Sequence, residues 1–308
     1  MSFSATACAK VILFGEHAVV YGRQAVALPL PDLRARAEYL PGSSPFSLDA
    51  PEIGVTSPLA ALSAGHPLRE TLRIVCERLG LEVRNGTLRI SSEIPVASGL
   101  GSGAAVTTAI VRALASAHGV DLAPAQVSAI VFEAEAVYHG TPSGIDNSVI
   151  ALERPILFIR GTPPQPLDLG GPFDLTVADS GVRSETRVAV GAVRDAWQRD
   201  TPTFERLFDE IGACASQSLR ALAEGDLAQV GLLMNRNQDV LVRLGVSTAG
   251  LERIVHAARR AGALGAKLTG AGLGGNIIAL GEAHHAAAIR AACEAAGARW
   301  VRTTTVQP

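Results

Sequence analysis

The stretch PVASGLGSGAAV, residues 95–106, restricts the possible folds of this chain more than any other segment. It follows a strand predicted over 87–94 and precedes a helix predicted over about 102–117. Three glycines within five positions let the backbone approach a ligand closely. The N-terminus of the helix adds free N–H groups and a partial positive charge. The loop therefore suits the phosphates of a nucleotide, although close packing of a helix on a strand would favour the same small residues.

Two well-known phosphate-binding loops can be compared with this stretch. A Walker A loop needs a lysine directly after its last glycine, and neither this stretch nor TGAGLGG at 269–275 has one. Gly99, Gly101 and Ala104 fit a loose dinucleotide-binding fingerprint, but that fingerprint requires a strand after the helix. A second helix, predicted from Pro124 to His139, follows instead. A nucleotide-dependent dehydrogenase is therefore disfavoured.

Strands and helices follow one another without the regular βαβ order of a doubly wound sheet, which favours an α+β fold. The first half has strand-like runs at 7–14, 24–29, 33–40 and 87–94, and the second half has them at 174–179, 265–269, 276–280 and 299–304. The densest cluster of proline and glycine lies at 161–172 and is the expected boundary. We therefore predict two domains, residues 1–168 and 169–308.

The composition argues against several classes of protein. The net charge is −2 without a basic run, so neither nucleic acid nor an anionic membrane is an expected partner. The four cysteines are scattered and form no C-x-x-C pair, which predicts a reducing, cytoplasmic environment and no zinc site. No apolar run approaches the roughly 18 residues of a membrane-spanning helix.

Lysine is rare in this chain. Of 27 basic residues only Lys10 and Lys267 are lysines, and the others are arginines. A lysine ammonium is a compact point charge that the planar guanidinium of arginine does not replace. Both lysines lie beside glycine-bearing segments, which favours a functional position for each over retention by chance.

Three stretches resemble, in this order, the motifs of the GHMP kinase superfamily: KVILFGEHAVVYG at 10–22, PVASGLGSGAA at 95–105 and KLTGAGLGG at 267–275. HGTPSGIDN at 139–147 and LGVS at 244–247 further resemble the mevalonate kinases within that superfamily. The resemblance covers nearly the whole chain. It implies an α+β fold of two domains, an N-terminal α/β nucleotide-binding domain and a C-terminal ferredoxin-like domain, with the active site in the cleft between them.

The resemblance also implies an activity, the phosphorylation of the C5 hydroxyl of (R)-mevalonate by ATP and Mg²⁺, in an enzyme that is often a homodimer. It implies that Asp146 is the general base and that Lys10 is its cationic partner. Ser102 and Glu135 correspond to the Mg²⁺ ligands of the family. This intact set disfavours a catalytically silent sensor of ATP or a metabolite, and phosphomevalonate kinase activity is the other alternative.

The remaining site residues are also implied by the resemblance. The nucleotide would be bound by Pro95, Ser98, Gly99, Leu100, Gly101, Ser102, Gly103, Ala104, Lys267, Gly270 and Gly272. Mevalonate would be contacted by Glu16, His17, Asp146 and Gly272.

The chain departs from the family pattern at Ala97, Gly103 and Asn276. Loss of a serine at position 103 is expected to weaken a secondary phosphate contact. His284 and His285 are expected to be surface residues without a partner at metal-ligand spacing.

Overall fold

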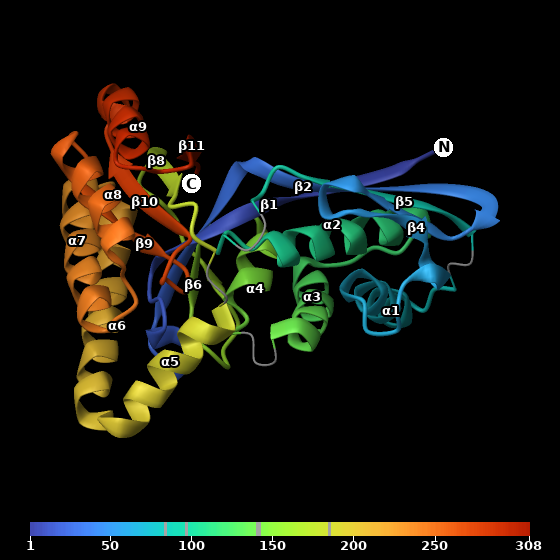
Figure 1. Cartoon of the computed structure of the whole chain (residues 1–308), viewed down its shortest axis with the longest axis horizontal. Coiled ribbons are helices and arrows are strands. Elements are labelled where there is room, and N and C mark those ends of the chain that lie inside the picture. The colour runs from blue at the N-terminus through green and yellow to red at the C-terminus, as the bar shows by residue number, and fades with distance from the viewer. Residues whose placement is uncertain (83–84, 96–97, 140–142, 184–185) are drawn as a thin grey trace. The chain divides into compact units, whose positions relative to one another are not determined.

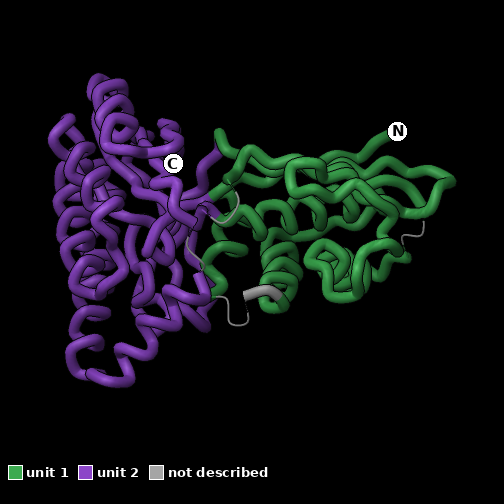
Figure 2. Tube along the Cα trace, in the orientation of Figure 1, with its two compact units in different colours: residues 1–9, 32–96, 101–153 green, residues 10–31, 97–100, 154–308 purple. Residues whose placement is uncertain are grey.

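The computed structural model of the chain describes residues 1–82, 85–95, 98–139, 143–183 and 186–308, without the side chains of 138 and 139 (Figure 1). Ala97 and residues 140–142 of the HGTPSGIDN motif lie outside the described residues. The chain divides into two compact units (Figure 2). Unit 1 comprises residues 1–9, 32–96 and 101–153, and unit 2 comprises residues 10–31, 97–100 and 154–308. The sequence boundary between residues 168 and 169 remains a prediction.

The sheet of unit 1 has the strand order β4-β3-β5-β2, with β1 also paired to β2. The strands are β1 (Phe3–Phe14), β2 (Ala25–Pro45), β3 (Ser47–Ala50), β4 (Val55–Pro58) and β5 (Asn85–Ser92). The strand-like runs predicted at 24–29 and 33–40 form one continuous strand, because the φ angle that Pro29 and Pro31 impose is also compatible with an extended chain. In β2, buried Leu33, Ala35 and Ala37 alternate with more exposed charged residues, as the sequence pattern predicts.

Four helices lie on one side of this sheet (Figure 1). They are α1 (Pro67–Leu79), α2 (Ser102–Ala117), α3 (Pro124–His139) and α4 (Ile145–Leu152). The helices predicted over 102–117 and 124–139 are confirmed. The short 3₁₀ helix Pro51–Ile53 connects β3 to β4, and a second one, Leu59–Ala61, follows β4 and precedes α1.

Unit 2 contains the start of β2, which pairs with β6 (Ile156–Phe158), and β6 in turn pairs with β7 (Gln165–Pro166). Its main sheet has the order β11-β8-β10-β9, all neighbours being antiparallel. The strands are β8 (Phe173–Asp179), β9 (Gly265–Thr269), β10 (Asn276–Gly281) and β11 (Trp300–Val306). Helices separate β8 from β9 and β10 from β11, so the order is the βαββαβ arrangement of a ferredoxin-like fold. The expected ferredoxin-like fold of the C-terminal domain is confirmed.

The helices of unit 2 are α5 (Thr186–Arg199), α6 (Thr201–Glu224), α7 (Leu227–Arg243), α8 (Ala249–Arg260) and α9 (Ala286–Ala295). Two 3₁₀ helices, Ala18–Tyr21 and Ala283–His285, complete the unit. Its core joins Phe208 of α6 and Ile254 of α8 to Ile277 of β10. Among the described residues, no helix is long and apolar enough to cross a membrane.

Candidate active site

Alternate residues from Lys267 to Ala271 contact the first motif within unit 2. The Lys267 ammonium donates to Glu16 Oε1 and, at 2.6 Å, to the carbonyl of Leu268. The hydroxyl of Thr269 accepts from the N–H of Ile12 and donates to its carbonyl, both at 3.0 Å. His17 Nε2 lies 2.9 Å from the carbonyl of Ala271. Lys267 and Thr269 point to one face of β9 because they are two residues apart in the strand, whereas Ala271 contributes a backbone carbonyl from beyond the bend at Gly270.

Burial shifts the pKa values of the ionisable side chains where the first and third motifs meet. The side chains of Glu16 and Lys267 are both 0% exposed. Burial raises the pKa of the Glu16 carboxyl and lowers the pKa of the Lys267 ammonium, and the attraction between the two groups opposes both shifts. Burial also lowers the pKa of His17 to about 4, so the ring is neutral at pH 7. The His17 Nε2–H therefore donates to Ala271, and Nδ1 is left as an acceptor.

The turn that holds His17 is strained. His17 has φ 60°, an uncommon value for a residue with a side chain. The ring contact with Ala271 and the burial of the side chain hold this conformation. Such strain is typical of a turn whose function requires the His17 side chain in one fixed position.

The phosphate-loop residues 98–100 contact the third motif in the same unit. The amide of Asn276 donates to the carbonyl of Ser98. A Cβ on Gly270 would lie 3.5 Å from the carbonyl oxygen of Gly99, so the two glycines approach each other with little space to spare. The N–H of Lys10 donates to the carbonyl of Leu100 at 3.0 Å. Residues 98–100 of the second motif therefore meet the first and third motifs within unit 2, and Asn276 contributes to that junction although it departs from the family pattern.

Gly272 packs against the LGVS segment. A Cβ on Gly272 would lie 2.3 Å from the carbonyl oxygen of Val246, and its φ is 73°. The N–H of Leu273 donates to the same carbonyl at 2.7 Å. This position therefore requires glycine for packing as well as for conformation.

Glu135 lies close to the start of α2 in unit 1, the helix that Ser102 begins. Ser102 is the first residue of α2, directly after Gly101, whose φ of 75° turns the chain into the helix. Glu135 on α3 is 8% exposed. A Cβ on Gly103 would already lie 2.9 Å from Glu135 Oε1, so the carboxylate lies against the first turn of α2. The lack of a side chain at position 103 thus makes room for Glu135.

Asp146 lies in the first turn of α4, after Gly144 with φ 93°, and it is half-buried. The helix is attached to α3 by Asn147, whose amide donates to the carbonyl and hydroxyl oxygens of Ser128 at 3.1 and 2.8 Å. Lys10 is 2% exposed and belongs to unit 2, whereas Asp146 belongs to unit 1. Their pairing stays a prediction.

The other residues that are expected to contact the nucleotide differ in burial. Leu100 and Ala104 are almost fully buried, so only their backbone groups could reach a ligand. Pro95 is half-buried. Ser98 is 6% exposed. No sequence pattern predicts the pairing of Glu16 with Lys267, although the rarity of lysine singles out Lys267.

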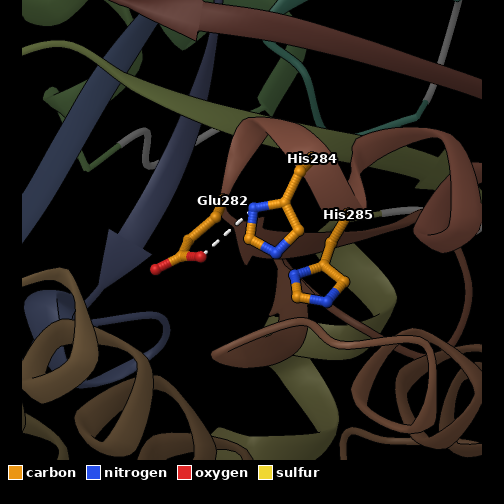
Figure 3. A group of neighbouring side chains, drawn as sticks. All are labelled: Glu282, His284 and His285. Atoms are coloured by element: carbon orange, nitrogen blue, oxygen red, sulfur yellow. Dashed lines mark ion pairs between the residues drawn. The ribbon is translucent and has the colours of Figure 1, made fainter.

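A second group of side chains lies at the connection between β10 and α9 (Figure 3). Glu282 Oε2 lies 3.3 Å from His284 Nδ1, and the possible ligand atoms of Glu282, His284 and His285 all lie within 4.8 Å of one another. The expectation that the two histidines have no partner at metal-ligand spacing is wrong, because the 3₁₀ helix Ala283–His285 brings Glu282 beside them. Glu282 and His284 are exposed, and the group shares no residue with the three motifs.

Comparison with known proteins agrees with the motifs. The family model for the GHMP kinases N terminal domain matches residues 66–153, and that for the GHMP kinases C terminal matches residues 218–299. A mevalonate kinase of Methanothermobacter thermautotrophicus is 35% identical over 284 residues, covering 91% of this chain and 90% of the relative. A mevalonate kinase of Aeropyrum pernix is 35% identical and covers 90% and 87%. The chain therefore belongs to the GHMP kinase family.

Solved structures agree in fold. The crystal structure of L. major mevalonate kinase in complex with R-mevalonate has a TM-score of 0.86 at 31% identity, covering 99% of this chain and 96% of that one. The Methanococcus jannaschii mevalonate kinase has a TM-score of 0.85 at 24% identity and covers 100% and 98%. The chain is thus a kinase with the two-domain α+β fold of this family.

Proposed function

We propose that the chain is a mevalonate kinase, which transfers the γ-phosphoryl group of ATP to the C5 hydroxyl of (R)-mevalonate. The observation that carries the proposal is the junction of the three motifs in unit 2, with residues 10–17, 98–100 and 267–276 in mutual contact. The names of the relatives at 35% identity support mevalonate as the substrate.

The nucleotide phosphates would be bound by backbone N–H groups of residues 98–103. Gly99 and Gly101 have φ values of 85° and 75°, which side chains would disfavour, and the loop leads directly into the N-terminus of α2. A helix N-terminus stabilises negative charge without any cationic side chain. This arrangement fits a loop that cradles phosphates and does not need a Walker lysine.

Ser102 and Glu135 would hold Mg²⁺. A hydroxyl and a carboxylate are hard oxygen ligands of the kind that Mg²⁺ prefers. The close approach of Glu135 to the first turn of α2, the helix that Ser102 begins, supports this pair of ligands. When bound, the ion neutralises charge on the transferred phosphoryl group.

Asp146 would accept the proton of the mevalonate hydroxyl, and Lys10 would stabilise the charge of the carboxylate and of the transferring group. Asn147 and Ser128 hold the helix of Asp146 against α3, which fixes the direction of the base. His17, neutral and buried, would accept a hydrogen bond from mevalonate through Nδ1.

A coupled assay of ADP release tests this function. Purified protein is given Mg²⁺ and ATP with (R)-mevalonate, phosphomevalonate, galactose or homoserine in separate reactions. Turnover confined to mevalonate supports the proposal, and turnover only with another acceptor would reject it. A homodimer, a cytoplasmic location and the boundary at 168/169 are further predictions, and size-exclusion chromatography with light scattering tests the first of them.

A further inference from the structure

Glu16 and Lys267 form a buried ion pair that connects the turn of the first motif to β9. Lys267 Nζ donates to one carboxylate oxygen of Glu16 and to the carbonyl of Leu268. Both side chains are fully buried within unit 2. An ammonium that already has two acceptors and no exposed surface is poorly placed to bind a phosphate in solvent.

The strand that carries Lys267 is fixed from its other edge by α7. Asn235 accepts from the N–H of Ala266 at 3.1 Å and donates to the carbonyl of Leu264 at 3.1 Å. Gln238 accepts from the N–H of Leu268 at 2.8 Å. These two amides satisfy backbone groups that an edge strand would otherwise leave unpaired. β9 is therefore a rigid base for the lysine.

The first motif contacts β9 and the segment directly after it at three points. Glu16 binds Lys267, the backbone of Ile12 binds Thr269, and His17 binds the carbonyl of Ala271. Lys10 lies on the same strand as Ile12 and binds the carbonyl of Leu100 through its own N–H. A displacement of the turn at Glu16 would thus be passed to Lys10 and to the phosphate loop.

The rarity of lysine in the chain agrees with this buried pair. A guanidinium carries five donors in a rigid plane and is difficult to satisfy in a closed space, whereas an ammonium has three donors around one atom. The acceptors on Glu16 and Leu268 suit the smaller group. A larger guanidinium is therefore disfavoured at this closed site.

We propose that Glu16 and Lys267 form a positioning pair, which fixes the turn at residues 15–17 on β9 and thereby places Lys10 and the phosphate loop. Neither side chain contacts the nucleotide or mevalonate. This inference rests on the proposed function, and it assigns both residues a different role from the ligand contacts that the family resemblance implies.

A double-mutant cycle on the full chain, with Lys267→Met, Glu16→Met and the double variant, tests the pair. Lys267→Met leaves the Glu16 carboxylate buried without its partner, so Tm should fall by about 10 °C. Its kcat should fall at least about tenfold because Lys10 is misplaced, while the KM values for ATP and mevalonate stay within about threefold. The double variant Glu16→Met/Lys267→Met removes both charges and should recover most of the Tm and at least part of kcat.

Exposed Arg220 on α6, which pairs with Glu224, provides the matched control. Arg220→Met should leave Tm and kcat nearly unchanged. A tenfold rise of KM for ATP in Lys267→Met with an unchanged Tm would overturn the proposal, as would a double variant no more stable than Lys267→Met. The Tm cycle needs no substrate, so it tests the pair even if the wild-type protein fails to phosphorylate mevalonate.

Discussion

The hydroxyl of Thr269 bonds to both backbone groups of Ile12, accepting from its N–H and donating to its carbonyl at 3.0 Å each. Thr269 is 2% exposed, so water does not replace these bonds. The side chain thereby substitutes for a neighbouring strand at the point where the first motif meets the third.

Thr269→Val keeps the shape of this side chain and removes both hydrogen bonds. A buried N–H and a buried carbonyl then lack partners, which should lower the free energy of unfolding by roughly 2–4 kcal/mol. Thr269→Ser retains the hydroxyl and should lose about 1 kcal/mol, the contribution of one methyl group. Urea unfolding of the three proteins measures the difference. Equal stability of the valine and serine variants would show that the hydroxyl contributes nothing.

Gly103→Ser places a side chain against Glu135, since its Cβ would lie 2.9 Å from Oε1. The carboxylate must move, and we expect the Mg²⁺ concentration for half-maximal activity to rise about three- to tenfold. Gly191→Ser on α5, where a Cβ meets no atom within 4 Å, is the control and should not change it. An unaltered Mg²⁺ dependence in Gly103→Ser would contradict the expected displacement of Glu135.

His17 makes stability depend on pH. Its pKa is lowered by burial from 6.5 to about 4. Between these values the unfolded chain binds a proton that the folded chain does not, so the free energy of unfolding falls as the pH falls. By pH 4 this loss should amount to roughly 3 kcal/mol.

The pH effect of His17 is isolated by comparing the wild type with His17→Gln at each pH from 7 to 4. Burial raises the pKa of Glu16, which has the opposite effect on stability as the pH falls, but Glu16 is present in both proteins. The difference in stability between the two should shrink steadily below pH 6.5. A constant difference would mean that folding does not lower the pKa of His17.

Glu153 joins three elements of unit 1. Its carboxylate accepts from Arg34 at 2.9 Å and from Arg112 on α2, and Arg112 also donates to the carbonyl of Thr6 at 2.9 Å. Glu153→Ala leaves two guanidinium groups without this acceptor and should lower the free energy of unfolding by about 1–3 kcal/mol. Glu77→Ala, which breaks an exposed pair with Arg73 on α1, is the control and should cost under about 0.5 kcal/mol. Chemical unfolding that finds equal losses would contradict this account.

The elements with a strong local pattern were predictable from the sequence. The helix at 102–117 has regular apolar spacing, and the strand at 33–40 alternates buried and charged residues. The pairing of Glu16 with Lys267 was not predictable, because the residues are 251 positions apart and no local period connects them. Glu282 beside the histidines was missed because the short 3₁₀ helix Ala283–His285 brings the histidines beside the residue that precedes it, and no sequence period indicates this.

The most direct test of the central claim is ADP release with (R)-mevalonate by the wild type and by Asp146→Asn. We predict steady turnover by the wild type. The variant should lose at least about 10²-fold in kcat because it lacks the general base, while its affinity for ATP stays within about threefold. No turnover of mevalonate by the folded wild type would contradict the proposed function, and an active Asp146→Asn variant would contradict the assignment of the base.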